Sequence, residues 1–339
     1  MEPLVSIVVL NLNGKKHLKD CLPSLQRQNY KNIEIIIVDN NSTDGSLEFV
    51  KNTYPKVKLI ASKKNLGFTG GNNLGVQKAA GKYLLFLNND IKVDKNFLLP
   101  LVKALEKDES IGIAQSKILL WDKPEIIDSV GCYFTFLGAF WHEAYGEKDK
   151  GKYARQREIF GATGAALFIS KTLFQKLGGF DEAYFIYFED VDLSWRAWRR
   201  GRRVVLVPQS MVYHKHGATT SKNLPSSFWV FHTFKNSLYV LLKNLNIGYL
   251  FFIFPLYLIL SMGGGFLFLL RLKPASFLAA YQGIFWNISN FSFILKQRQK
   301  ARKEIIFSDS QVFSKAAKKL PLSYFISWPK DYLKLWGKD

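Results

Sequence analysis

The sequence predicts an α/β domain built on an open sheet with helices on both faces, followed by a smaller hydrophobic part. Over the first 220 residues, short β-branched runs alternate with stretches in which apolar residues recur at helical spacing. Helices that connect strands in this way make right-handed crossovers and give parallel strands. Acidic and amide side chains follow several of the strands, at the sheet edge where open α/β sheets bind ligands.

The first half of the domain alternates regularly between strand and helix. The expected strands are apolar runs bounded by turn residues, and they cover Leu4–Leu10, Ile33–Val38, Val57–Ala61 and Tyr83–Leu87. The expected helices carry apolar residues on one face, and they cover Leu18–Leu25, Thr43–Val50 and Gly71–Ala80. This order is typical of nucleotide-binding domains.

The second half of the domain is less regular. Strands are expected at Ile111–Gln115, Gly164–Ser170 and Arg203–Val207, and helices at Lys171–Leu177 and Glu189–Arg200. The stretch from Trp121 to Phe160 is rich in aromatic residues and Gly, and it is interpreted as a loop or β-hairpin on the side where an acceptor would bind. Cys21 and Cys132 are too few to indicate a disulfide framework or a cysteine metal site.

The C-terminal part predicts attachment to a membrane. Asn244–Leu270 contains no charged residue and exceeds the roughly 20 apolar residues that cross a bilayer. Pro274–Leu295 is a second charge-free run, so a helical hairpin or a span with a re-entrant helix is expected. A soluble bundle of buried helices is the alternative, but the Phe-rich and Leu-rich runs leave no polar face for solvent.

Charge supports the same interpretation. The first 220 residues carry a net charge of +8 and the remaining residues +12, and so basic a segment favours nucleic acid or anionic lipid as a partner. Lipid is preferred because the basic cluster Lys296–Lys303 follows the apolar runs and no nucleic-acid motif occurs. No secretory signal follows Met1, so the α/β domain is expected in the cytoplasm. The expected domains are 1–220, a helical connector at 221–245, a membrane-associated hairpin at 246–295 and a basic amphipathic tail at 296–339.

Two strand ends carry oxygen ligands. Asn88 and Asp90 follow a buried strand, where an extended backbone would turn both side chains to one side and Asn89 to the other. Such hard ligands suit a divalent cation, Mg²⁺ or Mn²⁺, that neutralises a diphosphate, although an Asx turn is an equally simple explanation. Asp39 ends another strand and has no evident capping role, because Ser42, Thr43 or Asp44 would cap the next helix, so Asp39 is expected to bind a nucleotide base.

Three further features complete the predicted site. The glycine-rich stretch Asn65–Asn73 places three glycines at the start of an expected helix, so that backbone amides and the positive helix end could approach a diphosphate. Asp190 is the expected general base at the start of a helix, with Glu189 beside it, whereas Asp192 is expected to form an i, i+4 ion pair with Arg196. His214 is a candidate metal ligand, with His216 as its competitor.

Taken together, the chain resembles the rhamnosyltransferase-like branch of glycosyltransferase family 2, which has the GT-A fold, a mixed sheet with helices on both faces. The matching stretches are Val5–Asn13, Val38–Asp44, Asn65–Gly75, Leu85–Asp90, Gly161–Ser170 and Gly178–Gly201. One departure is that Asn88, Asn89 and Asp90 stand where the family usually has Asp-x-Asp, which leaves one fewer charge for the metal.

The resemblance implies inverting, metal-dependent transfer from a UDP- or dTDP-sugar, of rhamnose type, to a hydroxyl of a lipid-linked or cell-surface glycan in polysaccharide synthesis. The implied catalytic residues are Asp190 and Glu189, and the implied metal ligands are Asp90, Asn88 and His214. The implied donor-binding residues are Asn11, Asn13, Asp39, Asn65, Gly67, Asn73, Asn88 and Asn89. A homo-oligomer is also possible.

Two other functions compete with this one. A sugar nucleotidyltransferase would carry a glycine-rich signature with Arg and Lys after the first strand, which Asn11–Gly14 lacks. A non-catalytic, membrane-anchored protein that only binds a sugar nucleotide or glycan would have lost a carboxylate at Asp90 or Asp190, and both are present.

Overall fold

The computed structural model describes residues 2–215 and 225–318. Contacts divide the chain into two compact units, which are described separately. The first unit comprises Met1–Cys132 and His142–Thr219, and the second comprises Tyr133–Trp141 and Thr220–Asp339. Two parts of the expected domain plan, residues 221–224 and 319–339, lie outside the described residues, as does His216.

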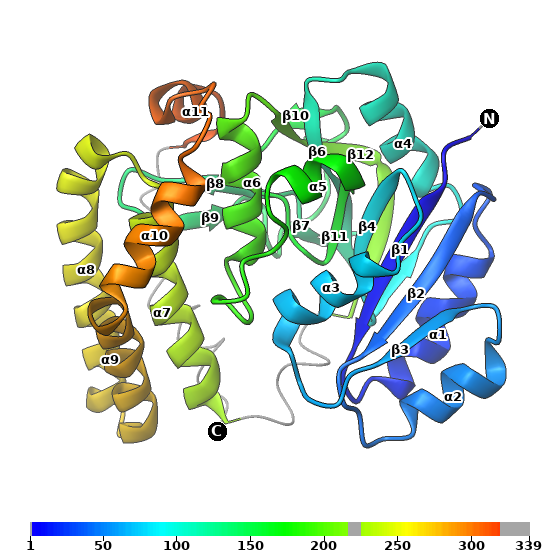
Figure 1. The fold of residues 1–339 in the computed structure, drawn as a ribbon, viewed down its shortest axis with the longest axis horizontal. Coiled ribbons are helices and arrows are strands. Elements are labelled where there is room, and N and C mark those ends of the chain that lie inside the picture. The colour runs from blue at the N-terminus through cyan, green and yellow to red at the C-terminus, as the bar shows by residue number, and fades with distance from the viewer. Residues whose placement is uncertain (1, 216–224, 319–339) are drawn as a thin grey trace. The chain divides into compact units, whose positions relative to one another are not determined.

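The first unit is built on a mixed sheet (Figure 1). Within residues 2–215, ten strands join it, and eight of them follow the order β10-β12-β6-β11-β4-β1-β2-β3. These eight strands are β1 (Val5–Asn11), β2 (Ile33–Asp39), β3 (Lys58–Ala61), β4 (Tyr83–Asn88), β6 (Ile111–Leu120), β10 (Arg157–Glu158), β11 (Ala166–Ser170) and β12 (Arg203–His214). The other two are β5 (Ile91–Val93), which pairs with β12, and β7 (Ile127–Ser129), which pairs with β6.

The four strands β3, β2, β1 and β4 are parallel, as the alternation of strand and helix predicts. β11 is antiparallel to both β4 and β6 and makes the sheet mixed, while β12 and β6 are parallel. Because β11 runs the other way, its first residues lie at the carboxyl end of β4. The residues that precede β11 therefore reach the edge at which β1, β2 and β4 end.

Helices cover both faces of the sheet. One face buries Val5, Ile7 and Val9 of β1 in the core cluster that also contains the apolar residues of three helices. These helices are α1 (Lys15–Gln26), α2 (Ser46–Thr53) and α4 (Leu98–Lys107). The helices of the opposite face are α3 (Gly67–Gln77), α5 (Lys171–Lys176) and α6 (Glu189–Arg199), in front of the sheet in Figure 1.

Three expected elements differ by more than three residues at one end, namely α3, β12 and β6, which continues to Leu120 and does not end at Gln115. Helix α3 begins at Gly67 and not at Gly71, so most of the glycine-rich stretch lies within the helix. Its glycines allow close packing on β1, since a Cβ at Gly71 would lie 2.3 Å from Leu10 Cδ1 and one at Gly75 would lie 2.5 Å from Val8 Cγ1. Strand β12 does not stop at Val207 but continues to His214 past an irregularity that contains Pro208.

The second unit is mainly helical. Its helices are α7 (Ser226–Asn244), α8 (Ile247–Leu270), α9 (Pro274–Ser289), α10 (Phe291–Ala301) and α11 (Asp309–Ala316), and the strands β8 (Cys132–Phe134) and β9 (Phe140–His142) form a small hairpin. A Cβ at Gly283 of α9 would lie 2.6 Å from the Phe231 carbonyl oxygen, so α7 and α9 approach closely. The stretch Trp121–Phe160, expected as a loop or β-hairpin, contains this hairpin and also β7 and β10, which join the main sheet.

Among the described residues, α8 is the one helix long and apolar enough to cross a membrane. Its mean hydropathy is 2.1 over a window of which 22% is buried. Phe251 and Phe252 are each 75% exposed, so α8 does not resemble the core helix of a soluble bundle. Helix α9 has 16 residues, fewer than the roughly 20 that a span requires.

The basic cluster Lys296–Lys303 divides into two groups. Arg298 Nη1 donates to the Leu242 carbonyl at 2.7 Å, and Arg302 Nη1 donates to the Asn244 carbonyl at 3.1 Å. These two arginines therefore cap the C-terminal end of α7, where carbonyl groups lack helical partners. Three exposed lysines of the cluster point to solvent, namely Lys296, Lys300 and Lys303.

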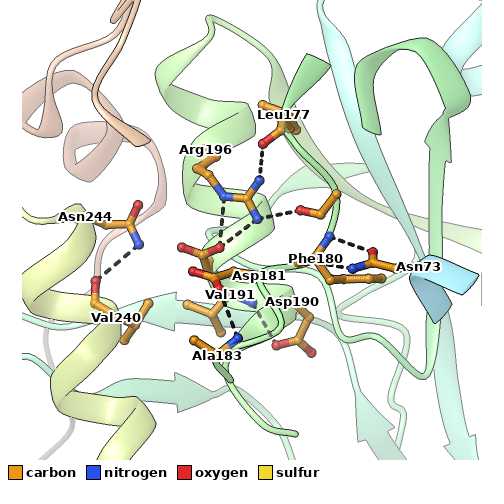
Figure 2. A network of polar contacts seen from close by, with 12 residues as sticks. Asn73, Leu177, Phe180, Asp181, Ala183, Asp190, Val191, Arg196, Val240 and Asn244 are labelled. Atoms are coloured by element: carbon orange, nitrogen blue, oxygen red, sulfur yellow. Dashed lines mark hydrogen bonds and ion pairs between the residues drawn. The ribbon is translucent and has the colours of Figure 1, made fainter. Parts of the chain in front are cut away.

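The ion pair expected at the start of α6 is confirmed. Arg196 Nε and Nη2 donate to Asp192 Oδ2 at 2.9 and 2.7 Å, and the Asp192 side chain is fully buried. Arg196 also donates to the carbonyl oxygen of Leu177, as Figure 2 shows, and to that of Gly179, and so fixes the turn between α5 and α6.

We expect Asp192→Ala to lower the free energy of unfolding by about 3–5 kcal/mol, because it leaves a buried guanidinium without its carboxylate. The matched control is Lys82→Ala, which breaks the exposed Lys82–Glu106 pair and should cost less than about 1 kcal/mol. Denaturant unfolding of both variants measures the difference, and equal losses would contradict a structural role for Asp192.

Candidate active site

Asn11 joins the ends of three neighbouring strands. It is the last residue of β1 and its side chain is fully buried. Its Nδ2 donates to Asp39 Oδ2 of β2 at 3.0 Å, and its Oδ1 accepts from Nδ2 of Asn89, directly after β4, at 2.8 Å. One amide thus fixes a carboxylate and a second amide at the same edge of the sheet.

The loop after β1 packs against Asn89 and is hydrogen-bonded to Ser42. A Cβ at Gly14 would lie 2.1 Å from Asn89 Nδ2, so only glycine leaves room for the bond between Asn11 and Asn89. Asn13, with a positive φ of 50°, donates its backbone N–H to Ser42 Oγ at 2.9 Å. Ser42 N in turn donates to Asp39 Oδ1 at 2.9 Å.

The side chains after β4 do not follow the expected extended pattern. β4 ends at Asn88, and Asn89 and Asp90 form a turn. Asn89 points to Asn11 and not away from the site, whereas Asp90 Oδ1 lies 3.2 Å from His214 Nε2. The continuation of β12 beyond Val207 brings His214 to this place, because His214 pairs with Ile91 of β5, directly after Asp90.

His214 lies between two carboxylates. Its Nδ1 lies 2.7 Å from Oδ2 of Asp128, a buried residue of β7, and its Nε2 faces Asp90. Burial alone would lower the pKa of His214, but the hydrogen bonds to Asp128 and Asp90 outweigh burial and raise the pKa to about 10. His214 Nε2 therefore carries a proton at neutral pH, and a cation that binds this nitrogen has to displace that proton.

Asp90 and His214 have the spacing of two ligands of one cation. Bonds of about 2.1 Å at right angles place neighbouring ligand atoms of an octahedral ion about 3 Å apart, and Asp90 Oδ1 and His214 Nε2 are separated by 3.2 Å. Among the described residues, no group of three His, Cys, Asp or Glu side chains could hold an ion together. A cation here would need oxygens from a bound diphosphate and water besides these two residues, as is usual for Mg²⁺.

Asn65 lies in a second group of amide side chains. Asn40 Nδ2 donates to Asn65 Oδ1 at 2.8 Å and to the Gly67 carbonyl at 3.1 Å, while Asn40 Oδ1 accepts from Leu66 N. Asn40 directly follows Asp39 and is buried. The start of α3 is therefore attached to the end of β2.

The start of α3 also contacts the segment before α6. The Phe185 carbonyl accepts hydrogen bonds from Phe68 N at 2.7 Å and Thr69 N at 3.2 Å. Three residues of this segment have positive φ, Phe185 at 66°, Tyr187 at 69° and Phe188 at 70°. Left-handed conformations in bulky residues are strained, and such strain gathers at functional sites.

Asp190 and Glu189 begin α6 at the same sheet edge. Asp190 Oδ2 accepts from Gly164 N at 2.8 Å, and the adjacent Ala165 carbonyl accepts from Asn88 N at 3.1 Å. Burial raises the pKa of the Asp190 carboxyl, although hydrogen bonds from Gly164 and Val191 oppose the rise. Burial raises the pKa of Glu189 as well, and the charge of Asp190 adds to it.

The structure separates Asn73 from the other predicted donor-binding residues. Asn73 Nδ2 donates to the Phe180 carbonyl at 2.8 Å, and Asn73 Oδ1 accepts from Phe180 N at 3.0 Å (Figure 2). The amide of Asn73 therefore holds the turn between α5 and α6, which gives this side chain a structural role.

Sequence reasoning missed Asp128 and Asn40. Asp128 lies in the stretch 121–160, where periodicity gave no strand and therefore no strand end at which to look for ligands. Asn40 follows Asp39 directly at the end of the same predicted strand, but sequence reasoning assigned a role to Asp39 alone.

Comparison with known proteins identifies the family to which the chain belongs. Residues 6–178 match the model of Glycosyl transferase family 2. The chain is 26% identical over 274 residues to an N-acetylglucosaminyl-diphospho-decaprenol L-rhamnosyltransferase of Mycobacterium tuberculosis, which covers 74% of this chain and 87% of the relative. It is also 28% identical over 241 residues to the O-antigen biosynthesis protein RfbC of Myxococcus xanthus, covering 67% of this chain and 19% of that protein.

Solved structures confirm the GT-A fold. A mannosyltransferase of Pyrobaculum calidifontis in complex with GDP-Man and Mn²⁺ has a TM-score of 0.54 at 14% identity, covering 100% of this chain and 89% of that one. The structure of GalNAc-T7 with UDP, GalNAc and Mn²⁺ has a TM-score of 0.54 at 20% identity and covers 73% of this chain. This chain spans about half, 52%, of the length of GalNAc-T7.

We expect Gly67→Ala to disturb the contact between α3 and the segment before α6. Gly67 has a φ of 69°, and its Cβ would lie 2.4 Å from the Phe185 carbonyl oxygen. Gly178→Ala is the matched control, because Gly178 has a φ of 86° with no atom within 4 Å of its Cβ position. Backbone strain alone costs about 1–3 kcal/mol in both variants, and thermal unfolding should show a larger loss for Gly67→Ala. Equal losses would contradict the contact.

Proposed function

Because the chain belongs to glycosyl transferase family 2 and is a glycosyltransferase that uses a nucleotide-sugar donor, we propose that it transfers a sugar with inversion to a hydroxyl of a lipid-linked glycan. A UDP- or dTDP-sugar of rhamnose type is the proposed donor. One observation carries the proposal: Asp190, Asp90 and His214 approach the same end of β4, so that a general base and a candidate cation site meet at one edge of the sheet.

The donor would bind along the ends of β1 and β2. Asp39 is held by Asn11 and Ser42, and its carboxylate could accept the imide hydrogen of a uracil or thymine ring. Asn13 is bonded to Ser42, and Asn65 and Gly67 are bonded to Asn40, so all three lie beside the segment that begins at Asp39, which supports their assignment to donor binding. Asn88 and Asn89 lie next to Asp90, where the diphosphate would be bound.

Asp190 would act as the general base in a single displacement. Its carboxylate takes the proton of the acceptor hydroxyl, the acceptor oxygen forms a bond to the anomeric carbon, and the bond from that carbon to the diphosphate oxygen breaks. Nucleoside diphosphate leaves with the bonding electron pair, and the anomeric configuration inverts. Burial raises the pKa of Asp190 toward the range in which a carboxylate is an effective base.

A divalent cation fits the residues beside this base. Asp90 and His214 would hold Mg²⁺ or Mn²⁺ with the side chain of Asn88, and the ion, when bound, stabilises the charge on the departing diphosphate. The 3.2 Å separation of Asp90 Oδ1 and His214 Nε2 supports this assignment, as does the Mn²⁺ named in the two similar structures.

A lipid-linked acceptor agrees with the second unit. The Mycobacterium relative is named for a decaprenol-linked substrate, and α8 exposes Phe251 and Phe252. Such an apolar surface, together with the exposed lysines of α10, would suit an anionic membrane at the cytoplasmic side. The protein would therefore meet its acceptor where the lipid carrier resides.

Asp190→Asn should abolish transfer while donor binding remains. The loss of a general base lowers kcat by about 10²–10⁴, whereas the affinity for the donor should change less than about twofold. Release of nucleoside diphosphate from a panel of UDP- and dTDP-sugars, with Mg²⁺, Mn²⁺ or chelator, measures kcat. The control is Asp181→Asn, which removes a carboxylate that caps the turn at Ala183. Wild-type turnover by Asp190→Asn would contradict the role of this carboxylate.

The pH dependence gives an independent test of the same base. Only the ionised carboxylate accepts a proton, and the pKa of Asp190 is raised. Transfer should therefore rise with pH through a midpoint above the ordinary range of aspartic acid and be lost as pH falls through it. An acid limb at the pKa of an exposed aspartate would contradict this expectation.

Exchange of Phe251 and Phe252 for Asp should weaken binding to phospholipid vesicles. Burial of one Phe side chain contributes about 1.5–3 kcal/mol, so the double variant should bind at least about tenfold more weakly. Co-sedimentation of the full-length protein with anionic and neutral vesicles measures binding. Phe136→Asp is the control, because Phe136 is 52% exposed but lies outside α8. Equal losses in the two variants would contradict insertion through α8.

A further inference from the structure

Asp128 and His214 approach each other from two strands that flank the end of β6. Asp128 lies in β7, which pairs with β6 through Ile118 and Leu119, and His214 ends β12, which pairs with the same part of β6. Because β6 separates the two strands in the sheet, the contact between these side chains depends on the register of both pairings. The contact is therefore a property of the fold and not of a flexible loop.

The contact determines which imidazole nitrogen faces the site. An ionised carboxylate can only accept hydrogen bonds, so the 2.7 Å contact with Asp128 Oδ2 places a hydrogen on His214 Nδ1. Nε2 is then the nitrogen directed to Asp90 Oδ1, at 3.2 Å. Asp128 is 6% exposed and Asp90 is 5% exposed, so little solvent competes for either bond.

We infer that Asp128 is a positioning residue that orients His214 so that Nε2 can bind a divalent cation together with Asp90. Asp128 itself cannot reach that cation, because its carboxylate is bonded to the opposite nitrogen of the ring. A carboxylate behind a metal-binding histidine fixes the ring and makes the other nitrogen a better ligand. The inference rests on the proposed function, because it assumes a cation at Asp90 and His214.

A purely structural role would have a different signature. The neighbouring pair Lys117–Asp149 also joins β6 to a later segment, with Lys117 Nζ and Asp149 Oδ2 at 2.6 Å, but it does not contact His214. Loss of Asp149 should therefore lower stability without a specific effect on cation binding. Loss of Asp128 should affect cation binding even where the protein remains folded.

Mn²⁺ titration of the full-length protein, with and without UDP, tests the inference. Asp128→Ala should weaken Mn²⁺ binding about 10- to 100-fold. Asp128→Asn should lose less, because an amide oxygen can still accept from Nδ1–H and keep the ring oriented. Asp149→Asn is the matched control and should bind Mn²⁺ as the wild type does. UDP binding without metal should be unchanged in all three variants.

The outcomes separate this inference from the proposed function. Wild-type protein that binds no Mn²⁺ and releases no nucleoside diphosphate from any sugar donor would overturn both. Wild-type Mn²⁺ affinity in a folded Asp128→Ala variant would overturn the inference alone. Should Asp128→Ala fail to fold, Asp128→Asn is the deciding variant. If Asp128→Asn bound Mn²⁺ no more weakly than the control Asp149→Asn, the inference would be overturned.

Discussion

The buried amide of Asn11 is the constraint on which the rest of the site depends. A side-chain amide offers donors on one side and an acceptor on the other, and here the donor binds Asp39 while the acceptor binds Asn89. Asp39 and Asn89 both lie beside Asn11 because β1 pairs in parallel with β2 and with β4, and the three strands end at the same level of the sheet. If the register of β2 or β4 against β1 shifted, Asp39 or Asn89 would lose its hydrogen bond to Asn11. A buried polar group without a hydrogen bond lowers the stability of the folded state. The packing of the sheet and the geometry of the site are thus specified by the same side chain.

Most of the fold could be predicted because its signals are local. Buried parallel strands appear as apolar runs, and the helices between them carry one apolar face, so the first four strands were readable to within one or two residues. The errors have a common cause, which is that tertiary packing overrode a local signal. Glycines in α3 were interpreted as a loop, although they allow that helix to lie close to β1. The expected strand ended at Val207, directly before Pro208, although β12 resumes its pairing at Met211 after an irregularity.

The candidate site was predictable where a residue follows a recognisable strand or begins a recognisable helix, as Asp190 does. Asp39, Asn88 and Asp90 satisfy that condition, and the structure brings them to one edge as a parallel sheet requires. Asp128 belongs to a three-residue strand without periodicity, so nothing in its neighbourhood distinguished it from any surface aspartate. Asn73 was predicted from its glycine-rich surroundings, and in the structure its amide holds a turn. The chemical roles of these residues stay predictions.

The irregularity in β12 has an evolutionary consequence. Three residues, 208–210, separate the two registers in which β12 pairs with β6. Side chains alternate between the faces of a strand, so deletion of a single residue there would turn every following side chain, His214 included, to the other face. Homologous chains should accordingly tolerate amino-acid exchanges in this short insertion far better than changes in its length, which makes its residue count a marker of descent among relatives that keep the histidine.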